Sequence, residues 1–227
     1  MIDLRRFTPA RVSLGRTGHS LPTAELLRFD LDHARARDAV HQPLDATAIG
    51  RPHLLVHSAA LDRREFLRRP DLGRQLAPGT DLPHGDCDLS IVVADGLSAP
   101  AAAHHAGPLL DALMPMLADW HVAPLVVALQ ARVALGDAIG TALGARMVVV
   151  LIGERPGLTS PDSLGVYLTW NPRPGRTDAE RNCISNIRSE GLAYDLAAQK
   201  LHFLMSEART RRLSGVDLKD TFQPLIG

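Results

Sequence analysis

The strongest constraint on the fold is a set of continuous apolar runs that begins at residue 89. The runs are Leu89–Ala94, Val122–Leu129 and Met147–Ile152, and segments of helical character alternate with them. Those segments are an Ala-rich stretch that ends near Trp120, and Ala134–Leu143. Strands that are apolar on both faces are typical of parallel sheets covered by helices on both sides. The sequence therefore predicts an α/β fold with a doubly wound, mainly parallel sheet of Rossmann-like architecture.

Two further segments complete this expected domain. Leu164–Leu168 is a candidate fourth strand, and Tyr194–Leu213 predicts a long C-terminal helix with one apolar face. Ligands of doubly wound domains bind at the carboxyl ends of the strands. Those ends are expected at Asp95–Ser98, Gln130–Val133 and Gly153–Gly157.

The first part of the chain follows a different pattern. Residues 1–20 contain Gly, Pro and Arg without periodicity, which predicts an extended arm. Ala24–Val40 then predicts a helix. A short strand is expected at Leu54–Val56 and a short helix at Asp62–Leu67. Residues 78–85 are expected to form a linker.

The charges of this first part favour a role in assembly. Residues 1–80 hold 13 Arg against 9 acidic residues, whereas 81–170 hold 3 Arg against 9. Arg is enriched in protein interfaces, where its planar group pairs well. We therefore expect an N-terminal arm and helical region, 1–85, that docks another subunit, and a Rossmann-like domain, 86–227.

Bulk composition excludes several classes of partner. Lys plus Arg and Asp plus Glu both total 25, which argues against nucleic acid or an anionic membrane. No secretory signal and no apolar run of membrane-spanning length is evident. The two cysteines, Cys87 and Cys183, make no disulfide framework. We expect a cytoplasmic protein.

Two motifs resemble catalytic or metal sites but have simpler interpretations. Ser98 follows a strand like the nucleophile of a hydrolase, yet Pro100 replaces the last Gly of the G-x-S-x-G motif. A helix cap is the simpler role for Ser98. The adjacent His104 and His105 would point about 100° apart on a helix, which disfavours a shared metal.

Two other motifs are treated in the same way. Gly15–Gly18 lacks both the preceding strand and the full pattern of a phosphate loop, and predicts a turn. Asp119–Pro124 nearly fits the D-x-H-x-x-G motif by which some cobalamin enzymes ligate cobalt through His. Pro124 replaces the Gly, and the segment enters a strand instead of leaving one. His121 is therefore not assigned as a ligand.

Six segments in order along the chain form a more specific pattern. They are Arg11–Gly18, Leu26–Phe29 with Asp32-His33, Arg69–Arg74, Val92–Ser98, Gly153–Leu158 and Cys183–Ile187. Together they resemble the light chain of ethanolamine ammonia-lyase, nearly from end to end.

The resemblance implies a reaction and an assembly. The family's enzyme converts ethanolamine to acetaldehyde and ammonia with adenosylcobalamin, whose cobalt–carbon bond breaks homolytically. A large TIM-barrel subunit holds the substrate and the radical chemistry, and the small subunit covers part of the cobalamin between them. We therefore expect a higher hetero-oligomer, with no catalytic residue and no metal ligand in this chain.

Carried over residue by residue, the family's cobalamin contacts fall on Val133, Glu154 and Cys183. The first two lie at expected strand ends, and Cys183 lies in the expected loop before the last helix. Core packing also explains Val133, and an inert buried thiol also explains Cys183. From the residues alone, Glu154 is better interpreted as a solvated carboxylate or a partner of Arg155; the resemblance instead favours a hydrogen bond from a corrin amide.

Two other functions stay open. One is a non-catalytic Rossmann-like module that binds a nucleotide or small ligand, and the other is a hydrolase that uses Ser98. The Arg-rich arm favours the enzyme subunit, because a self-contained binding domain does not need it.

Some family members carry a longer N-terminal extension linked to packaging in a bacterial microcompartment. This sequence begins close to the shared core, so packaging stays an alternative to a free cytoplasmic location.

Overall fold

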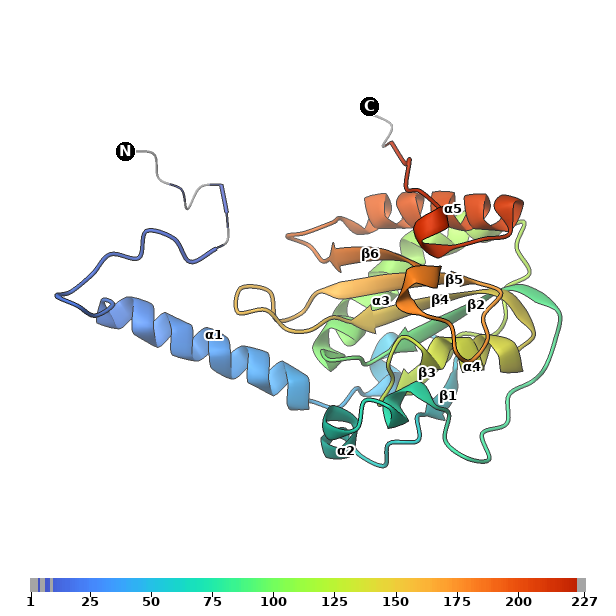
Figure 1. Ribbon diagram of the computed structural model, residues 1–227, viewed down its shortest axis with the longest axis horizontal. Helices are drawn as coiled ribbons and strands as arrows, with labels where there is room; N and C mark the ends of the chain where they lie inside the picture. The colour runs from blue at the N-terminus through green and yellow to red at the C-terminus, as the bar shows by residue number, and fades with distance from the viewer. Residues whose placement is uncertain (1–3, 5–6, 9, 224–227) are drawn as a thin grey trace.

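The computed structural model describes residues 4, 7, 8 and 10–223, whose centre is a six-stranded sheet between helices (Figure 1). The strands are β1 (Leu54–His57), β2 (Cys87–Ala94), β3 (Val126–Leu129), β4 (Ala145–Gly153), β5 (Leu164–Trp170) and β6 (Arg181–Ile187). The helices are α1 (Thr23–His41), α2 (Arg63–Arg68), α3 (Ala99–Leu113), α4 (Leu135–Ala142) and α5 (Tyr194–Arg211). None of these helices, in the part of the chain described, is long and apolar enough to cross a membrane.

The first four strands form the parallel half of the sheet, in the order β1-β3-β2-β4. Helix α3 connects β2 to β3, and α4 connects β3 to β4 on the opposite face. One apolar core therefore lies between the sheet, α3 and α5, and a second lies between the sheet and α4. The expected α/β class and the three apolar strands are confirmed.

The last two strands are antiparallel, so the sheet is mixed. The expected doubly wound, Rossmann-like arrangement is therefore not confirmed. The reason lies in the connection between β4 and β5, residues 154–163, which contains no helix. Parallel neighbours need a crossover of a dozen or more residues, usually helical, whereas antiparallel neighbours need only a short loop.

Strand β6 was not expected, and the expected loop position of Cys183 is wrong. Cys183 lies within β6, opposite Tyr167 of β5. The sequence RNCISNI lacks a continuous apolar run because only one face of the strand is buried. Half-buried strands show alternation instead of continuous hydrophobicity, and here the alternation is irregular.

The N-terminal region contributes both to the sheet and to a projecting element. Strand β1 pairs with β3, whereas α1 points away from the sheet, and Ala39 is its one buried residue (Figure 1). Arg11 holds the arm against α1: its Nη2 donates to the Glu25 carbonyl over 2.9 Å, and its guanidinium lies over Phe29. A division of the chain at residue 85 stays a prediction.

Close contact between two turns shapes the carboxyl edge of the sheet. Gly96, after β2, has φ +54°, and a Cβ there would overlap the Gly153 carbonyl at the end of β4. Leu97 N–H donates to that same carbonyl over 3.0 Å. The turn that follows β2 is therefore packed directly against the last residue of β4.

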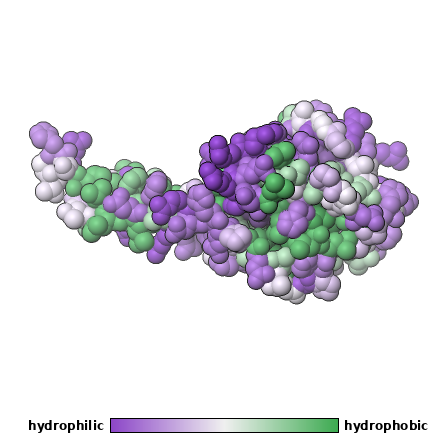
Figure 2. Space-filling view, turned by 90° about the horizontal axis from the view of Figure 1, so that it is seen from below, coloured by the Kyte–Doolittle hydropathy of each residue, from purple (hydrophilic) through white to green (hydrophobic). Residues whose placement is uncertain are grey.

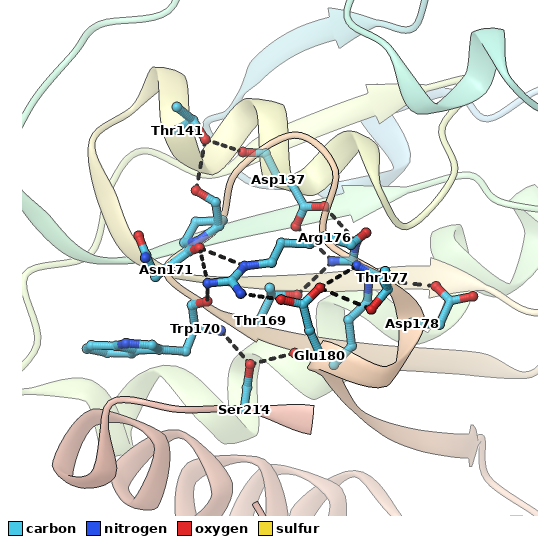
Figure 3. A network of polar contacts seen from close by, with 12 residues as sticks. Asp137, Thr141, Thr169, Trp170, Asn171, Arg176, Thr177, Asp178, Glu180 and Ser214 are labelled. Carbon is cyan, nitrogen blue, oxygen red and sulfur yellow. Dashed lines mark hydrogen bonds and ion pairs between the residues drawn. The ribbon is translucent and has the colours of Figure 1, made fainter. Parts of the chain in front are cut away.

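A buried ion pair joins helix α4, which packs on the parallel strands, to β6 of the antiparallel half. Both Arg181 Nη atoms, from β6, donate to the Asp137 carboxylate of α4, over 2.7 and 2.6 Å. Thr169 of β5 accepts a further bond from Arg181 over 2.8 Å. Both charged side chains are only 1% exposed. Figure 3 shows Asp137 and Thr169 in this network, beside the Arg176–Glu180 turn.

We predict that Arg181→Met lowers the free energy of unfolding by about 3–5 kcal/mol, because it leaves a buried carboxylate without its counter-ion. Urea denaturation followed by circular dichroism measures this. Arg146→Gln is the matched control, since Arg146 forms exposed pairs with Asp86 and Asp88 and should cost less than about 1 kcal/mol. Equal, small effects of both substitutions would contradict a structural role for the buried pair.

Candidate functional site

The antiparallel half of the sheet has one covered face and one open face. Ile184 and Ile187 of β6 pack under α5, whereas Cys183 and Ser185, which point the other way, are exposed. Helix α4, on that second side, packs mainly against β4 and β2. Residues directly opposite each other in antiparallel strands share a face, so Tyr167 lies on the open side with Cys183. We call this surface the open face.

Glu154 stands at one end of the open face. Its carboxylate accepts a hydrogen bond from Ser163 Oγ over 2.6 Å and a longer one from Asn186 N–H over 3.3 Å. A Cβ on Gly165 would lie 3.0 Å from Glu154 Oε1, so glycine leaves room for the carboxylate. Two donors therefore fix Glu154, and a carboxylate with about four lone-pair positions keeps acceptor capacity for a ligand.

Val133 lies in the loop after β3, at the same carboxyl edge of the parallel strands as Glu154. It lines a cavity of about 560 Å³ together with Tyr167, Arg74, Arg132 and Asp178. Burial raises the pKa of the Tyr167 hydroxyl, and the nearby Cys183 thiol and Glu154 carboxylate raise it further.

Tyr167 therefore connects the three residues implied by the resemblance. It shares the cavity with Val133, faces Cys183 across the strand pair, and lies within electrostatic range of Glu154. The structure thus brings Val133, Glu154 and Cys183 to one side of the sheet. Sequence reasoning missed Tyr167, although a polar aromatic residue inside the apolar run Leu164–Leu168 was a usable signal.

The crevice between the ends of β2 and β3 is filled by the protein itself. Asp95 accepts hydrogen bonds from the Gln130 and Ala131 backbone N–H groups, both over 2.9 Å, and pairs with Arg63 over 3.1 Å. Burial raises the pKa of Asp95, and the Arg63 charge opposes this. Asp95 consequently anchors the loop that carries Val133, so the expected ligand position at Asp95–Ser98 is occupied by protein groups.

The remaining motifs have structural roles. Ser98 is buried, accepts a bond from Ala101 N–H over 3.3 Å and donates to the Pro161 carbonyl over 3.0 Å. Its role as a helix cap is confirmed, and a hydrolase that uses Ser98 finds no support. His105 bridges the Tyr194 hydroxyl and the Asp162 carbonyl, over 2.8 and 2.6 Å.

Within residues 4, 7, 8 and 10–223, no group of three or more His, Cys, Asp or Glu side chains has an arrangement that could hold a metal ion. His121 lies at the amino end of the parallel strands, where its backbone bonds with Asp88. His121 is therefore at the opposite end of the parallel strands from Glu154, which follows the carboxyl end of β4.

Comparison with known proteins places the chain in a family. The family described as ethanolamine ammonia-lyase light chain (EutC) matches residues 1–219. The ethanolamine ammonia-lyase small subunit of Azotobacter vinelandii is 57% identical, over 96% of this chain and 87% of its own length. The small subunit of Pseudomonas fluorescens is 54% identical, over 98% of this chain and 87% of its own length. That of Xanthomonas campestris is also 54% identical, over 99% of this chain and 89% of its own length. The chain therefore belongs to the ethanolamine ammonia-lyase light-chain family.

Proposed function

We propose that this chain is the small subunit of an ethanolamine ammonia-lyase and forms one wall of an adenosylcobalamin site, which a large TIM-barrel subunit completes. The open face carries this proposal: it is an exposed sheet surface flanked by a fixed carboxylate, Glu154, and by the apolar Val133. Its free thiol, Cys183, suits a reducing cytoplasm.

The residues of the open face fit a corrinoid. Cys183 and Ser185 are small and exposed, so a broad, flat ring can approach the sheet there. Glu154 offers acceptor positions to the N–H groups of a corrin amide, and Val133 with Tyr167 offers apolar contact. When bound, adenosylcobalamin supplies the radical chemistry through homolysis of its cobalt–carbon bond. This chain's residues bind and orient the cofactor, and exclude water from one side of it.

The first prediction of this proposal is that the chain alone shows no ammonia-lyase activity, and that activity appears on mixing with the large subunit and adenosylcobalamin. The open face leaves a bound corrinoid exposed to water on one side, and radical chemistry needs a closed site. A coupled assay of acetaldehyde with alcohol dehydrogenase and NADH measures each component and the mixture. Turnover by this chain and cobalamin alone would refute a shared site.

The second prediction concerns Glu154. Glu154→Gln should weaken cobalamin binding by the assembled complex about ten- to a hundredfold, because a charge-assisted hydrogen bond contributes about 1.5–3 kcal/mol. The rate at saturating cofactor should change less. Titration of the complex with hydroxocobalamin measures the affinity, and Glu190→Gln, an exposed carboxylate in the turn after β6, is the control. Unchanged affinity of the Glu154 variant would remove it from the site.

We also propose that the N-terminal region docks the large subunit, mainly through α1. Leu26, Leu27 and Leu31 are 47%, 62% and 50% exposed, and Figure 2 shows hydrophobic side chains gathered on the projecting helix. Large apolar residues that cluster on an exposed surface mark interaction sites. A subunit that provides half of a cofactor site needs such a contact to close it.

The third prediction is that Leu27→Glu with Leu31→Glu, or deletion of residues 1–18, weakens association with the large subunit and leaves the α/β body folded. Charges placed in an apolar interface are costly to desolvate. Sedimentation of the mixed subunits measures association, and circular dichroism of the isolated chain measures folding. Val216→Glu, at an exposed apolar residue outside this region, should leave association intact. Full-strength complexes with both altered chains would contradict docking through α1.

A further inference from the structure

Three arginines gather beside the open face without a counter-ion. Arg74, Arg132 and Arg155 come from the short helix Leu72–Arg74, the loop after β3, and the loop after β4. Among the described residues, none of the three guanidinium groups forms an ion pair or a hydrogen bond with a protein acceptor, and the buried Arg132 Nε–H has no partner. Arg132 lies within electrostatic range of Arg63, Arg74 and Arg155, and the charge of Asp95 offsets theirs in part.

Arg132 is held in a fixed position at the centre of this group. Its guanidinium lies over the ring of the fully buried Phe66, 4.4 Å from the ring centre, and Arg63 lies over the same ring at 4.8 Å. A Cβ on Gly73 would lie 3.0 Å from the Arg132 side chain, so the glycine leaves room for that side chain. Arg132 N–H also donates to the Gly73 carbonyl over 2.8 Å. The side chain is thus pre-positioned at the wall of the cavity that contains Val133.

Nearby carboxylates do not neutralise the three arginines. Asp95 is paired with Arg63, and Glu180 is paired with Arg176. Of the described residues that line the cavity, Asp178 is the one acid; it is fully exposed and lies 3.8 Å from Arg181 Nε. Burial lowers the pKa of the Arg132 guanidinium, and its cationic neighbours lower it further. Arginine nevertheless stays charged in proteins. The positive charge of this cluster is therefore balanced only when an anion binds.

We propose that Arg132 and Arg74, with Arg155 beside them, bind the phosphodiester of the cofactor's nucleotide tail. This inference rests on the proposed cobalamin site, because Arg132 adjoins Val133 and Arg155 adjoins Glu154. The phosphodiester is the anionic group among neutral amide side chains of cobalamin. Both guanidinium groups line the same cavity, and arginine binds phosphate oxygens in bidentate fashion. The arginines thereby fix the tail while Glu154 holds the ring.

The test compares hydroxocobalamin with cobinamide, which keeps the corrin ring but lacks the phosphodiester and the nucleotide base. The full chain is assembled with the large subunit, and the affinity for each corrinoid is measured by spectral titration. Arg132→Gln and Arg74→Gln should each weaken hydroxocobalamin binding about tenfold or more, and change cobinamide binding little. Arg132→Lys should recover part of the loss, because it restores the charge but not the planar fork. Arg146→Gln, at the other end of β4, should alter neither affinity.

Three results would overturn this inference. The first is equal weakening of both corrinoids, which would place the arginines against the ring. The second is unchanged affinity for both, which would leave the cofactor site proposed above intact and exclude only the phosphate contact. The third is weaker subunit association of the Arg132 and Arg74 variants without any corrinoid, which would assign the arginines to carboxylates of the large subunit. A native complex that binds neither corrinoid would instead refute the cobalamin proposal itself.

Discussion

The ion pair between Asp137 and Arg181 is the interaction on which the arrangement of the open face depends. It connects the helix that covers the parallel strands to the last strand of the antiparallel half, across Thr169 of β5. Isolated charges at such depth are costly to desolvate, and only paired and hydrogen-bonded geometry offsets that cost. The pair therefore links α4, which packs mainly on β4 and β2, to the antiparallel strands. Next to it, Tyr167 is only partly buried and Cys183 is exposed.

The second constraint is the filled crevice at the carboxyl edge of β2 and β3. Open α/β sheets commonly bind ligands where neighbouring strands send their connections to opposite faces. Here Asp95 and Arg63 occupy that position and hold the loop of Val133 in place. The candidate site is consequently displaced to the neighbouring surface formed by the ends of β3 and β4 and by the antiparallel strands. A flat surface of this kind suits a ligand shared with a second protein better than one enclosed by a single chain.

Sequence reasoning found the parts of the fold that local patterns determine. The buried runs at Leu89–Ala94 and Met147–Ile152 indicated strands, and Glu154 was correctly expected at a strand end. The direction of β5 was missed, although the short segment 154–163, which carries no helix, leaves too little chain for a parallel crossover. Strand β6 was missed since its exposed face is polar.

The basic cluster was equally hidden from sequence reasoning. Arg74, Arg132 and Arg155 are far apart along the chain, and only the parallel packing of β1, β3, β2 and β4 brings their loops to one edge. A local motif cannot report such a juxtaposition. The resemblance to the light-chain family supplied residues of the candidate site, but the contacts that hold them in place had to come from the structure.

Cys183 allows the most direct test that the open face is covered by the cofactor. It is exposed, whereas Cys87 is buried and burial raises the pKa of its thiol, so Cys87 is an internal reference that should stay unmodified. The measurement is the rate at which iodoacetamide alkylates Cys183 in the assembled complex, followed by mass spectrometry of the peptide, with and without saturating hydroxocobalamin. Our account predicts that hydroxocobalamin slows the alkylation of Cys183 strongly. An unchanged rate, under conditions where spectral titration shows the corrinoid bound, would contradict the account.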